Sequence, residues 1–282
     1  MLPTPHAKVG ESPVWDARAG VLWWVDIPAP ALHRTNPATN ETRTWPLPEA
    51  CGSIALTRGD HIVLALRSGL HRFHPESGEV TFIVNPEPDR PMNRLNDGKV
   101  SPEGRFVVGS MNDQPDKTMT GGLHVLHPNG TAERLLDALI VSNGLAWGPD
   151  GRTVWHSDSR GGVIWIGDWD RRVGAVTNRR LVATVSEAQG RPDGAACDVE
   201  GGYWSAGVSA GVLNRWLPDG TLDRVVPLPV KWPTMPCFAG PGLRTCYVTS
   251  LIRDPTQAGP DDGRIVEVDL GVAGVPVARY AG

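Results

Sequence analysis

Four polar residues with oxygen-bearing side chains share one place relative to a glycine that recurs along the chain. The glycine follows eight residues after three of them and nine residues after the fourth, and the four are Asn96, Asn143, Asp193 and Glu11. Carboxylate and amide oxygens, with no cysteine or histidine at these positions, are typical ligands of a hard divalent cation. Taken singly, an Asn-Gly or Asp-Gly pair is also ordinary turn chemistry, and that interpretation stays open.

The recurring glycine ends a short turn between two apolar segments, and this unit occurs six times. The glycines are Gly20, Gly59, Gly104, Gly151, Gly201 and Gly242, at intervals of 39 to 50 residues. Flanking segments such as Val21–Val25 and Ile62–Leu66 are rich in β-branched, aromatic and other apolar residues, which predicts strands. A second repeated hairpin follows the first, as in Gly69–Pro75 and Gly122–Pro128.

Two hairpins per repeat, with a period of roughly 40–50 residues, are typical of a β-propeller blade. We therefore predict an all-β, six-bladed β-propeller with four antiparallel strands per blade, formed by residues 1–282 as a single domain. Two packed β-sandwiches are the alternative, but they do not explain a period that continues through the whole chain. Residues near 2–7 are expected to supply the outer strand that closes the ring with the last blade.

In a propeller, the four polar residues would begin innermost strands at one mouth of the central channel. Side chains at equivalent heights in different blades then converge on the axis, although up to 182 residues separate them in sequence. The sequence therefore predicts one polar cluster that binds one divalent cation. The residue types do not select among calcium, zinc, manganese, magnesium and iron.

Composition and charge argue against several classes of protein. Glycine and proline account for 59 of the 282 residues, which disfavours a helical bundle, and 11 tryptophans require a folded core. The net charge of −4 favours neither nucleic acid nor an anionic membrane as a partner. No apolar stretch approaches the ~20 residues of a membrane span, and the first residues lack the pattern of a secretory signal. Four cysteines without a CxxC pair fit a reduced, cytoplasmic chain.

Other features that could mark chemistry are set aside or left open. Gly207–Gly211 matches the GxSxG nucleophile elbow of α/β-hydrolases, but an elbow joins a strand to a helix, whereas this segment joins two predicted strands. Cys51 and Cys237 lie near the starts of innermost strands, so a soft-ligand role stays open beside that of a buried structural cysteine. His33, His71 and His124 occupy equivalent places in three hairpins, and we expect them on blade surfaces far from the channel.

Five short segments stand out as motifs within the repeats. They are GESPVWD (Gly10–Asp16), NRLNDGK (Asn93–Lys99), SNGLAW (Ser142–Trp147), RPDG (Arg191–Gly194) and PTMPCFAG (Pro233–Gly240). Together they resemble the senescence-marker-protein/gluconolactonase family, the regucalcin-like lactonases, in order and over roughly residues 8–268. Ser12 departs from the family pattern, in which glycine is commoner. Members of the family are six-bladed propellers with one divalent cation in the channel, and many hydrolyse sugar lactones.

The resemblance implies roles for five residues of this sequence. Glu11, Asn143 and Asp193 would be the metal ligands, and Asp193 would also accept a proton during catalysis. Arg94 and Asn96 would contact the substrate. Three oxygen ligands leave positions open for water and substrate, which suits a cation that polarises a lactone carbonyl. Arg94 offers a planar donor fork for substrate hydroxyls, with a surface ion pair as its alternative role.

The leading hypothesis is a metal-dependent hydrolase, gluconolactonase-like, that opens sugar aldonolactones to aldonic acids. A metal-dependent phosphotriesterase or arylesterase and a non-catalytic calcium-binding protein are the alternatives. Arg94 and Asn96 beside the metal favour a polar, hydroxylated substrate over an aromatic ester. The expected partner is therefore a small-molecule sugar lactone. The oligomeric state stays open, and a monomer is compatible with the sequence.

Overall fold

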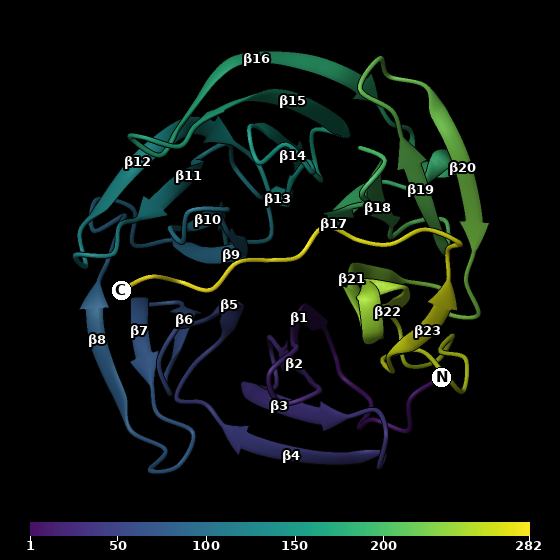
Figure 1. Cartoon of the computed structure of the whole chain (residues 1–282), viewed down its shortest axis with the longest axis horizontal. Coiled ribbons are helices and arrows are strands. Elements are labelled where there is room, and N and C mark those ends of the chain that lie inside the picture. The colour runs from purple at the N-terminus through teal and green to yellow at the C-terminus, as the bar shows by residue number, and fades with distance from the viewer.

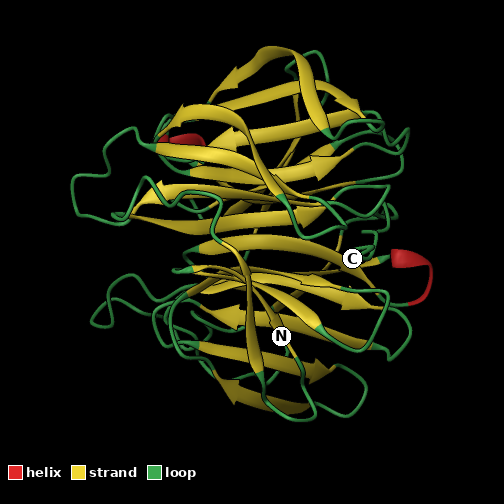
Figure 2. Cartoon of the chain, turned by 90° about the vertical axis from the view of Figure 1, so that its left-hand side faces the viewer, coloured by secondary structure: helices red, strands yellow, loops and turns green.

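The chain folds almost entirely into β-strands arranged around a central axis (Figures 1 and 2). This architecture is seen in a computed structural model that describes residues 1–282. The strands form six antiparallel sheets, and each sheet joins strands that are consecutive in sequence. The helical elements are two short 3-10 turns, η1 (Glu187–Gln189) and η2 (Pro241–Leu243), and no helix is long and apolar enough to cross a membrane.

Each sheet is one blade, and its strands are numbered from the channel outward. Blade 1 contains β1 (Gly10–Asp16), β2 (Val21–Asp26), β3 (Ala31–Asn36) and β4 (Glu41–Pro46), and blade 2 contains β5 (Cys51–Leu56), β6 (Ile62–Leu66), β7 (Gly69–Phe73) and β8 (Val80–Val84). Blade 3 contains β9 (Asn93–Val100), β10 (Phe106–Asn112), β11 (Gly121–Leu126) and β12 (Ala132–Leu139), and blade 4 contains β13 (Ser142–Trp147), β14 (Thr153–Asp158), β15 (Val163–Asp170) and β16 (Ala175–Thr184). Blade 5 contains β17 (Pro192–Cys197), β18 (Tyr203–Gly207), β19 (Val212–Trp216) and β20 (Leu222–Pro227), and blade 6 contains β21 (Pro233–Ala239), β22 (Thr245–Ser250) and β23 (Val266–Asp269).

The predicted six-bladed β-propeller is confirmed, with a difference in the last blade. Five blades have four strands, whereas blade 6 has three. The N-terminal segment runs beside the start of β23, where Leu2 forms an isolated antiparallel bridge with Ile265 (Figure 1). Pro3 and Pro5 have no backbone N–H, so they cannot extend this bridge into a regular ladder. Residues 2–7 therefore close the ring as expected, but through single contacts rather than as a strand.

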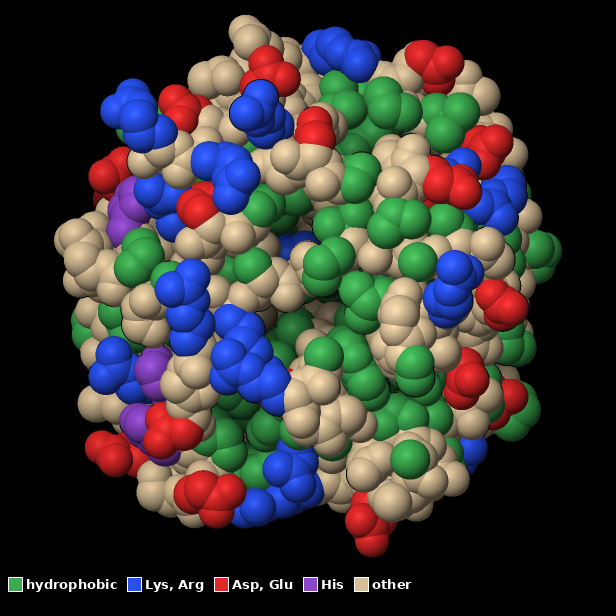
Figure 3. All heavy atoms as spheres, in the orientation of Figure 1, with side chains coloured by type: hydrophobic (Ala, Val, Ile, Leu, Met, Phe, Trp, Pro, Cys, Tyr) green, Lys and Arg blue, Asp and Glu red, His purple; other side chains and the backbone are tan.

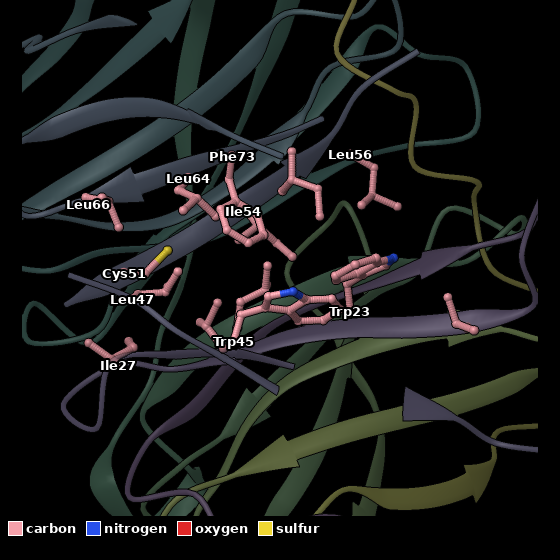
Figure 4. Close-up of a cluster of buried hydrophobic side chains, with 14 residues drawn as sticks. Trp23, Ile27, Trp45, Leu47, Cys51, Ile54, Leu56, Leu64, Leu66 and Phe73 are labelled. Atoms are coloured by element: carbon pink, nitrogen blue, oxygen red, sulfur yellow. The ribbon is translucent and has the colours of Figure 1, made fainter. Parts of the chain in front are cut away.

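Hydrophobic side chains fill the interfaces between neighbouring blades. Each of six buried clusters combines residues of two adjacent blades, and the cluster of 14 residues between blades 1 and 2 is drawn in Figure 4. Side chains alternate along a strand, so Trp23 of β2 joins this cluster and stacks on Trp45 with ring centroids 5.3 Å apart, whereas its neighbour Trp24 packs toward blade 6. Because both faces of a blade are covered in this way, second strands such as β2 and β6 are buried along their whole length.

The innermost strands combine a glycine turn at one end with a bulge at the other. The six predicted glycines lie between the first and second strands of their blades, and all except Gly59 have a positive φ. Near its start, every innermost strand has a register irregularity against the second strand, such as the one between Asn143 and Ala146 in β13 and the one between Pro192 and Ala195 in β17. A bulge bends a strand and re-aims its side chains. These bulges therefore determine which side chains face the channel mouth.

The last residues of the chain cover the mouth of the channel on the side of the glycine turns. This segment crosses from blade 5, where Val275 N donates to the Cys197 carbonyl at 2.9 Å, to blade 2, where Tyr280 N donates to the Leu56 carbonyl at 2.8 Å (Figure 1). Hydrophobic side chains gather around a hollow near the centre of this face (Figure 3). The starts of the innermost strands, with their polar residues, lie at the opposite mouth.

Candidate metal centre and substrate cavity

The five residues selected from the sequence lie together on the wall of one cavity. The cavity has a volume of about 170 Å³ and opens at the mouth where the innermost strands begin. Four blades contribute to it: Glu11 comes from β1, Arg94 and Asn96 come from β9, Asn143 comes from β13 and Asp193 comes from β17. The predicted convergence of these side chains in a single polar cluster therefore occurs in the structure.

A chain of hydrogen bonds connects four of these side chains across three blades. Arg94 Nη1 donates to Asn96 Oδ1 at 2.7 Å, and Asn96 Nδ2 donates to Asn143 Oδ1 at 3.3 Å. Asn143 Nδ2 in turn donates to Asp193 Oδ1 at 2.7 Å. The side chain of Asn143 is also fixed by a 2.7 Å hydrogen bond to the hydroxyl of Ser159. The arrangement holds the candidate substrate contacts and the candidate ligands in one rigid network.

Local backbone geometry fixes β1 and β13, two of the three innermost strands that carry candidate ligands. Ser12 adopts a φ of +47°, a conformation that glycine takes more easily, and its N–H donates to Glu11 Oε2 at 2.7 Å. Gly144 has a φ of +63°, and a Cβ there would lie 2.2 Å from the hydroxyl oxygen of Tyr203. The bulge after Asn143 therefore requires glycine. At Ser12 two buried hydrogen bonds stabilise the positive φ: the N–H donates to Glu11, and the hydroxyl accepts from Ile54 N at 3.0 Å.

The two carboxylates destabilise each other's charged form. Burial raises the pKa of Glu11 well above its usual range, and repulsion from Asp193 and then Asp97 raises it further. Burial also raises the pKa of Asp193, and repulsion from Asp97 adds to this shift. Asp193 itself is only partly exposed, on the wall of the cavity. The cluster thus has an excess of buried negative charge that a bound cation would neutralise.

The donor set fits a hard divalent cation. Glu11 and Asp193 would bring two negative charges, and Asn143 would bring a neutral amide oxygen, so a divalent ion leaves the centre near neutrality. No three His, Cys, Asp or Glu side chains gather in the structure in a way that could hold a metal, so a cation here would depend on the amide oxygen of Asn143 beside the two carboxylates. Because Nδ2 of Asn143 faces Asp193 here, coordination by its oxygen requires the opposite amide orientation.

Two buried charged residues of β9, Asp97 and Lys99, were not predicted from the sequence. Asp97 is 2% exposed and accepts a hydrogen bond from Leu145 N at 3.1 Å, and Lys99 donates to the Ala195 carbonyl. Burial lowers the pKa of Lys99, while the nearby Asp97 opposes the shift. Both residues belong to β9, the innermost strand of blade 3, and lie two residues apart in the sequence. That spacing is the signal from which a charged pair in the channel could have been inferred.

The other candidate chemical features lie outside the cavity. Cys51 and Cys237 are buried and do not line it, and burial raises the pKa of their thiols to about 12 and about 11, which holds them protonated. Gly207–Gly211 is a hairpin turn between β18 and β19, as expected, and not a nucleophile elbow. His33, His71 and His124 lie on the third strands β3, β7 and β11, away from the cavity. His71 is half-buried, whereas His33 and His124 are buried rather than on a blade surface: His33 stacks on Trp24 of its own blade, and His124 Nε2 lies 3.1 Å from Glu87 Oε1.

Comparisons with known proteins agree with this geometry. Residues 9–252 match the family model described as the SMP-30/gluconolactonase/LRE-like region. The chain is 34% identical to regucalcin of Xenopus laevis, covering 98% of this chain and 95% of that protein. It is 38% identical to 6-deoxy-6-sulfogluconolactonase of Pseudomonas putida, covering 86% of this chain and 83% of that protein.

A solved structure extends the comparison to the whole fold. The crystal structure of a calcium-binding protein, regucalcin, from Agrobacterium tumefaciens superposes with a TM-score of 0.90 at 26% identity, covering 98% of this chain and 94% of that one. The family match spans five complete blades and reaches into the sixth, and it includes every residue of the cavity identified above. The chain belongs to the SMP-30/gluconolactonase/LRE-like family.

Proposed function

We propose that the protein is a divalent-metal-dependent lactonase that opens sugar lactones to the corresponding aldonic acids. The observation that carries this proposal is the meeting of three oxygen donors with the Arg94–Asn96 pair at one small, polar cavity. The relative from Pseudomonas putida, which bears the name of a sugar lactonase, supports the reaction class at 38% identity.

A divalent cation held by Glu11, Asn143 and Asp193 would supply Lewis-acid chemistry, polarising the lactone carbonyl and acidifying water. The chain's own residues have complementary tasks. Asp193 would accept the proton that the attacking water loses, since one carboxylate oxygen borders the cavity. Coordination lowers the basicity of Asp193, and the transfer stays favourable because the water is acidified as well.

Arg94 would orient the substrate. Its Nε donates to Asp113 at 3.1 Å, and its Nη1 donates to Asn96 and to the Leu95 carbonyl, so these two nitrogens are held in place by the protein. Nη2 has no hydrogen-bond partner in the protein and remains free to donate to a ring hydroxyl or to the ester oxygen. Arg94 therefore combines a largely buried ion pair to Asp113 with a position on the cavity wall.

A non-catalytic, calcium-binding role is the second candidate. The observation in its favour is the similarity to regucalcin, since the Agrobacterium tumefaciens structure is described as a calcium-binding protein. Both candidates use the same cation, and they differ in whether a lactone is hydrolysed. An aromatic ester or phosphotriester substrate is less suited to a cavity whose wall is mostly polar.

The test is a panel of aldonolactones assayed after chelation and after re-addition of single metals. We expect chelation to lower kcat/KM at least 100-fold and one of Ca²⁺, Zn²⁺, Mn²⁺, Mg²⁺ or Fe²⁺ to restore it. Asp193→Ala is expected to abolish activity, and Asn143→Ala to weaken metal binding measured by calorimetry. Asp60→Ala is the matched control, because Asp60 is 92% exposed and far from the cavity.

Three outcomes test metal dependence, catalysis and folding separately. Full lactonase activity in the chelated protein contradicts metal dependence. Tight binding of calcium without turnover of any lactone in the panel contradicts the enzyme and favours the binding protein. Loss of activity in Asp60→Ala as large as that in Asp193→Ala would mean that the substitutions act through folding rather than through the site.

A further inference from the structure

Cations outnumber carboxylates on the wall of the candidate substrate cavity. Besides Glu11 and Asp193, which the metal centre uses, the charged side chains that line the cavity are Arg94, Lys117, Arg160 and Arg191. They come from four segments: β9, the connection between β10 and β11, the turn between β14 and β15, and the residue before β17. A bound divalent cation would neutralise the two carboxylates, so the four basic side chains then dominate the charge of the cavity.

These basic side chains have few counter-charges in the protein. A single carboxylate, Asp113, pairs with three cations. It lies 3.1 Å from Arg94 Nε and 3.8 Å from Lys117 Nζ, and it also pairs with Arg67, which lies outside the cavity. Arg160 is exposed and has no carboxylate within ion-pair distance. One carboxylate cannot neutralise three cations, so the side of the cavity formed by Lys117 and Arg160 keeps a net positive charge.

Arg191 differs from these two residues. Its Nη1 pairs with Glu187 at 2.9 Å, so much of its charge is already compensated. Lys117 feels both neighbouring cations: partial burial lowers its pKa, Asp113 opposes this shift, and repulsion from Arg94 and Arg160 lowers the pKa further. Three cations that repel one another at a cavity wall are stabilised when an anion binds between them.

We propose, resting on the proposed lactonase function, that the natural substrate is a sugar lactone with an anionic substituent, a phosphate, a sulfonate or a carboxylate, which Lys117 and Arg160 receive. The lactone carbonyl then faces Glu11, Asn143 and Asp193. Arg94 lies between the metal centre and the basic side of the cavity, where it can hold the ring that joins the two ends of the substrate. The shared chemistry of the substituent is a compact group of negatively charged oxygens.

The first experiment compares glucono-1,5-lactone with its 6-phosphate and with its 6-deoxy-6-sulfo analogue. For at least one charged lactone we expect a kcat/KM roughly ten or more times that of the neutral lactone at low ionic strength, because charge-assisted hydrogen bonds are about twice as strong as neutral ones. The preference should shrink as sodium chloride rises toward 0.5 M, since exposed charges are screened. The two charged probes distinguish a site for phosphate from one for sulfonate.

The second experiment uses Lys117→Gln and Arg160→Gln, with Arg152→Gln as the matched control. Arg152 is exposed, lies on the same blade at the other end of β14 and does not line the cavity. Each cavity variant is expected to lower kcat/KM for the preferred charged lactone about tenfold, mainly through KM, and to lower it much less for the neutral lactone. The control should change neither value.

A binding measurement separates this inference from the proposed function. Calorimetry with 6-phosphogluconate and with gluconate, the hydrolysis products, reports anion binding without turnover. Tighter binding of 6-phosphogluconate than of gluconate supports the anion site if Lys117→Gln and Arg160→Gln abolish the difference. This holds even if no lactone in the panel is hydrolysed and the proposed function fails. Equal affinity for both products, or equal kcat/KM for charged and neutral lactones, overturns the inference and leaves the lactonase proposal intact.

Discussion

Buried charge is the main physical feature of the site at the scale of single residues. Burial raises the pKa of Glu11, Asp193 and Asp97, and repulsion between carboxylates raises the pKa of Glu11 and Asp193 further. Lys99 lowers the pKa of Asp97 and so offsets this excess of negative charge only in part. Such an imbalance is costly in an apo protein and is relieved when a divalent cation binds.

The role of Arg94 leads to a prediction about substrate recognition. Arg94→Ala should lower kcat/KM by about 10- to 100-fold, since a hydrogen bond from a charged donor contributes about 1.5–3 kcal/mol. Metal affinity should change little, because Arg94 contacts Asn96 and Asp113 but none of the proposed ligands directly. The loss should be larger for polyhydroxylated lactones than for simple lactones without hydroxyls, as steady-state kinetics on both types will show.

Arg67→Ala is the control for that variant. Arg67 also pairs with Asp113, but it does not line the cavity, so its removal tests the ion pair without the substrate contact. A loss of similar size in Arg67→Ala, an equal loss on both types of lactone, or release of the metal by Arg94→Ala would assign Arg94 a structural role instead.

At the scale of elements, the innermost strands position the site through their bulges. In β17 the irregularity spans Asp193, and in β13 it begins immediately after Asn143. A regular strand would alternate its side chains between the two blade interfaces, which are apolar. The bulge instead directs a polar side chain toward the axis.

The third strands carry a buried histidine that makes stability depend on pH. His33 in β3 is 5% exposed, stacks on Trp24 with ring centroids 4.0 Å apart and contacts the hydroxyl of Thr44 at 2.8 Å. Burial lowers the pKa of His33 to about 4, although Asp26 opposes the shift. Between its unfolded pKa near 6.5 and about 4, the unfolded chain binds a proton that the folded protein does not. The free energy of unfolding should therefore fall as the pH falls through this range.

His33→Gln removes the titrating group and keeps a polar atom for Thr44. We expect the slope of the unfolding free energy against pH, measured by urea denaturation between pH 6 and 4.5, to be lower in the variant by up to about 1.4 kcal/mol per pH unit. At pH 8 His33 is neutral in both the folded and the unfolded protein. A difference in the free energy of unfolding between the two proteins at that pH therefore measures packing alone. Identical slopes in the two proteins would show that His33 binds its proton in the folded state.

At the scale of the whole molecule, the ring depends on its last interface as much as on the other five. The cluster between blades 6 and 1 contains eight buried residues, including Leu2 from the N-terminus and Ile265 from blade 6. Leu2 N also donates to the Ile265 carbonyl at 2.9 Å. The contact between the two ends of the sequence therefore substitutes for the missing fourth strand of the last blade.

Leu2→Ala tests this closure. Leu2 is 3% exposed, so the substitution should lower the free energy of unfolding by about 2–5 kcal/mol, as deletion of a buried leucine side chain does elsewhere. Val277→Ala is the control, because Val277 is 42% exposed and should cost about 0.5 kcal/mol or less. Equal effects of the two substitutions in urea denaturation would mean that the N-terminal segment contributes nothing to the ring.

The sequence by itself determined the number of blades, the glycine turns and the identity of the cluster Glu11, Asn96, Asn143 and Asp193. These features follow from local rules, since turn glycines, alternating apolar residues and equivalent positions in a repeat can be counted along a chain. The cyclic symmetry of a propeller then brings equivalent positions to one axis. The resemblance to a known family added the division into ligands and substrate contacts.

Only the tertiary structure decided the remaining features. The sharing of Asp113 by Arg67, Arg94 and Lys117 joins three segments of the chain that have no sequence pattern in common. Lys117 and Arg160 lie in the connections between the second and third strands of blades 3 and 4, and these connections, residues 113–120 and 159–162, differ in length. The three-stranded last blade depends on how Leu2 meets Ile265, residues 263 positions apart in sequence. Such contacts are set by the closure of the ring, and no local pattern in the sequence records them.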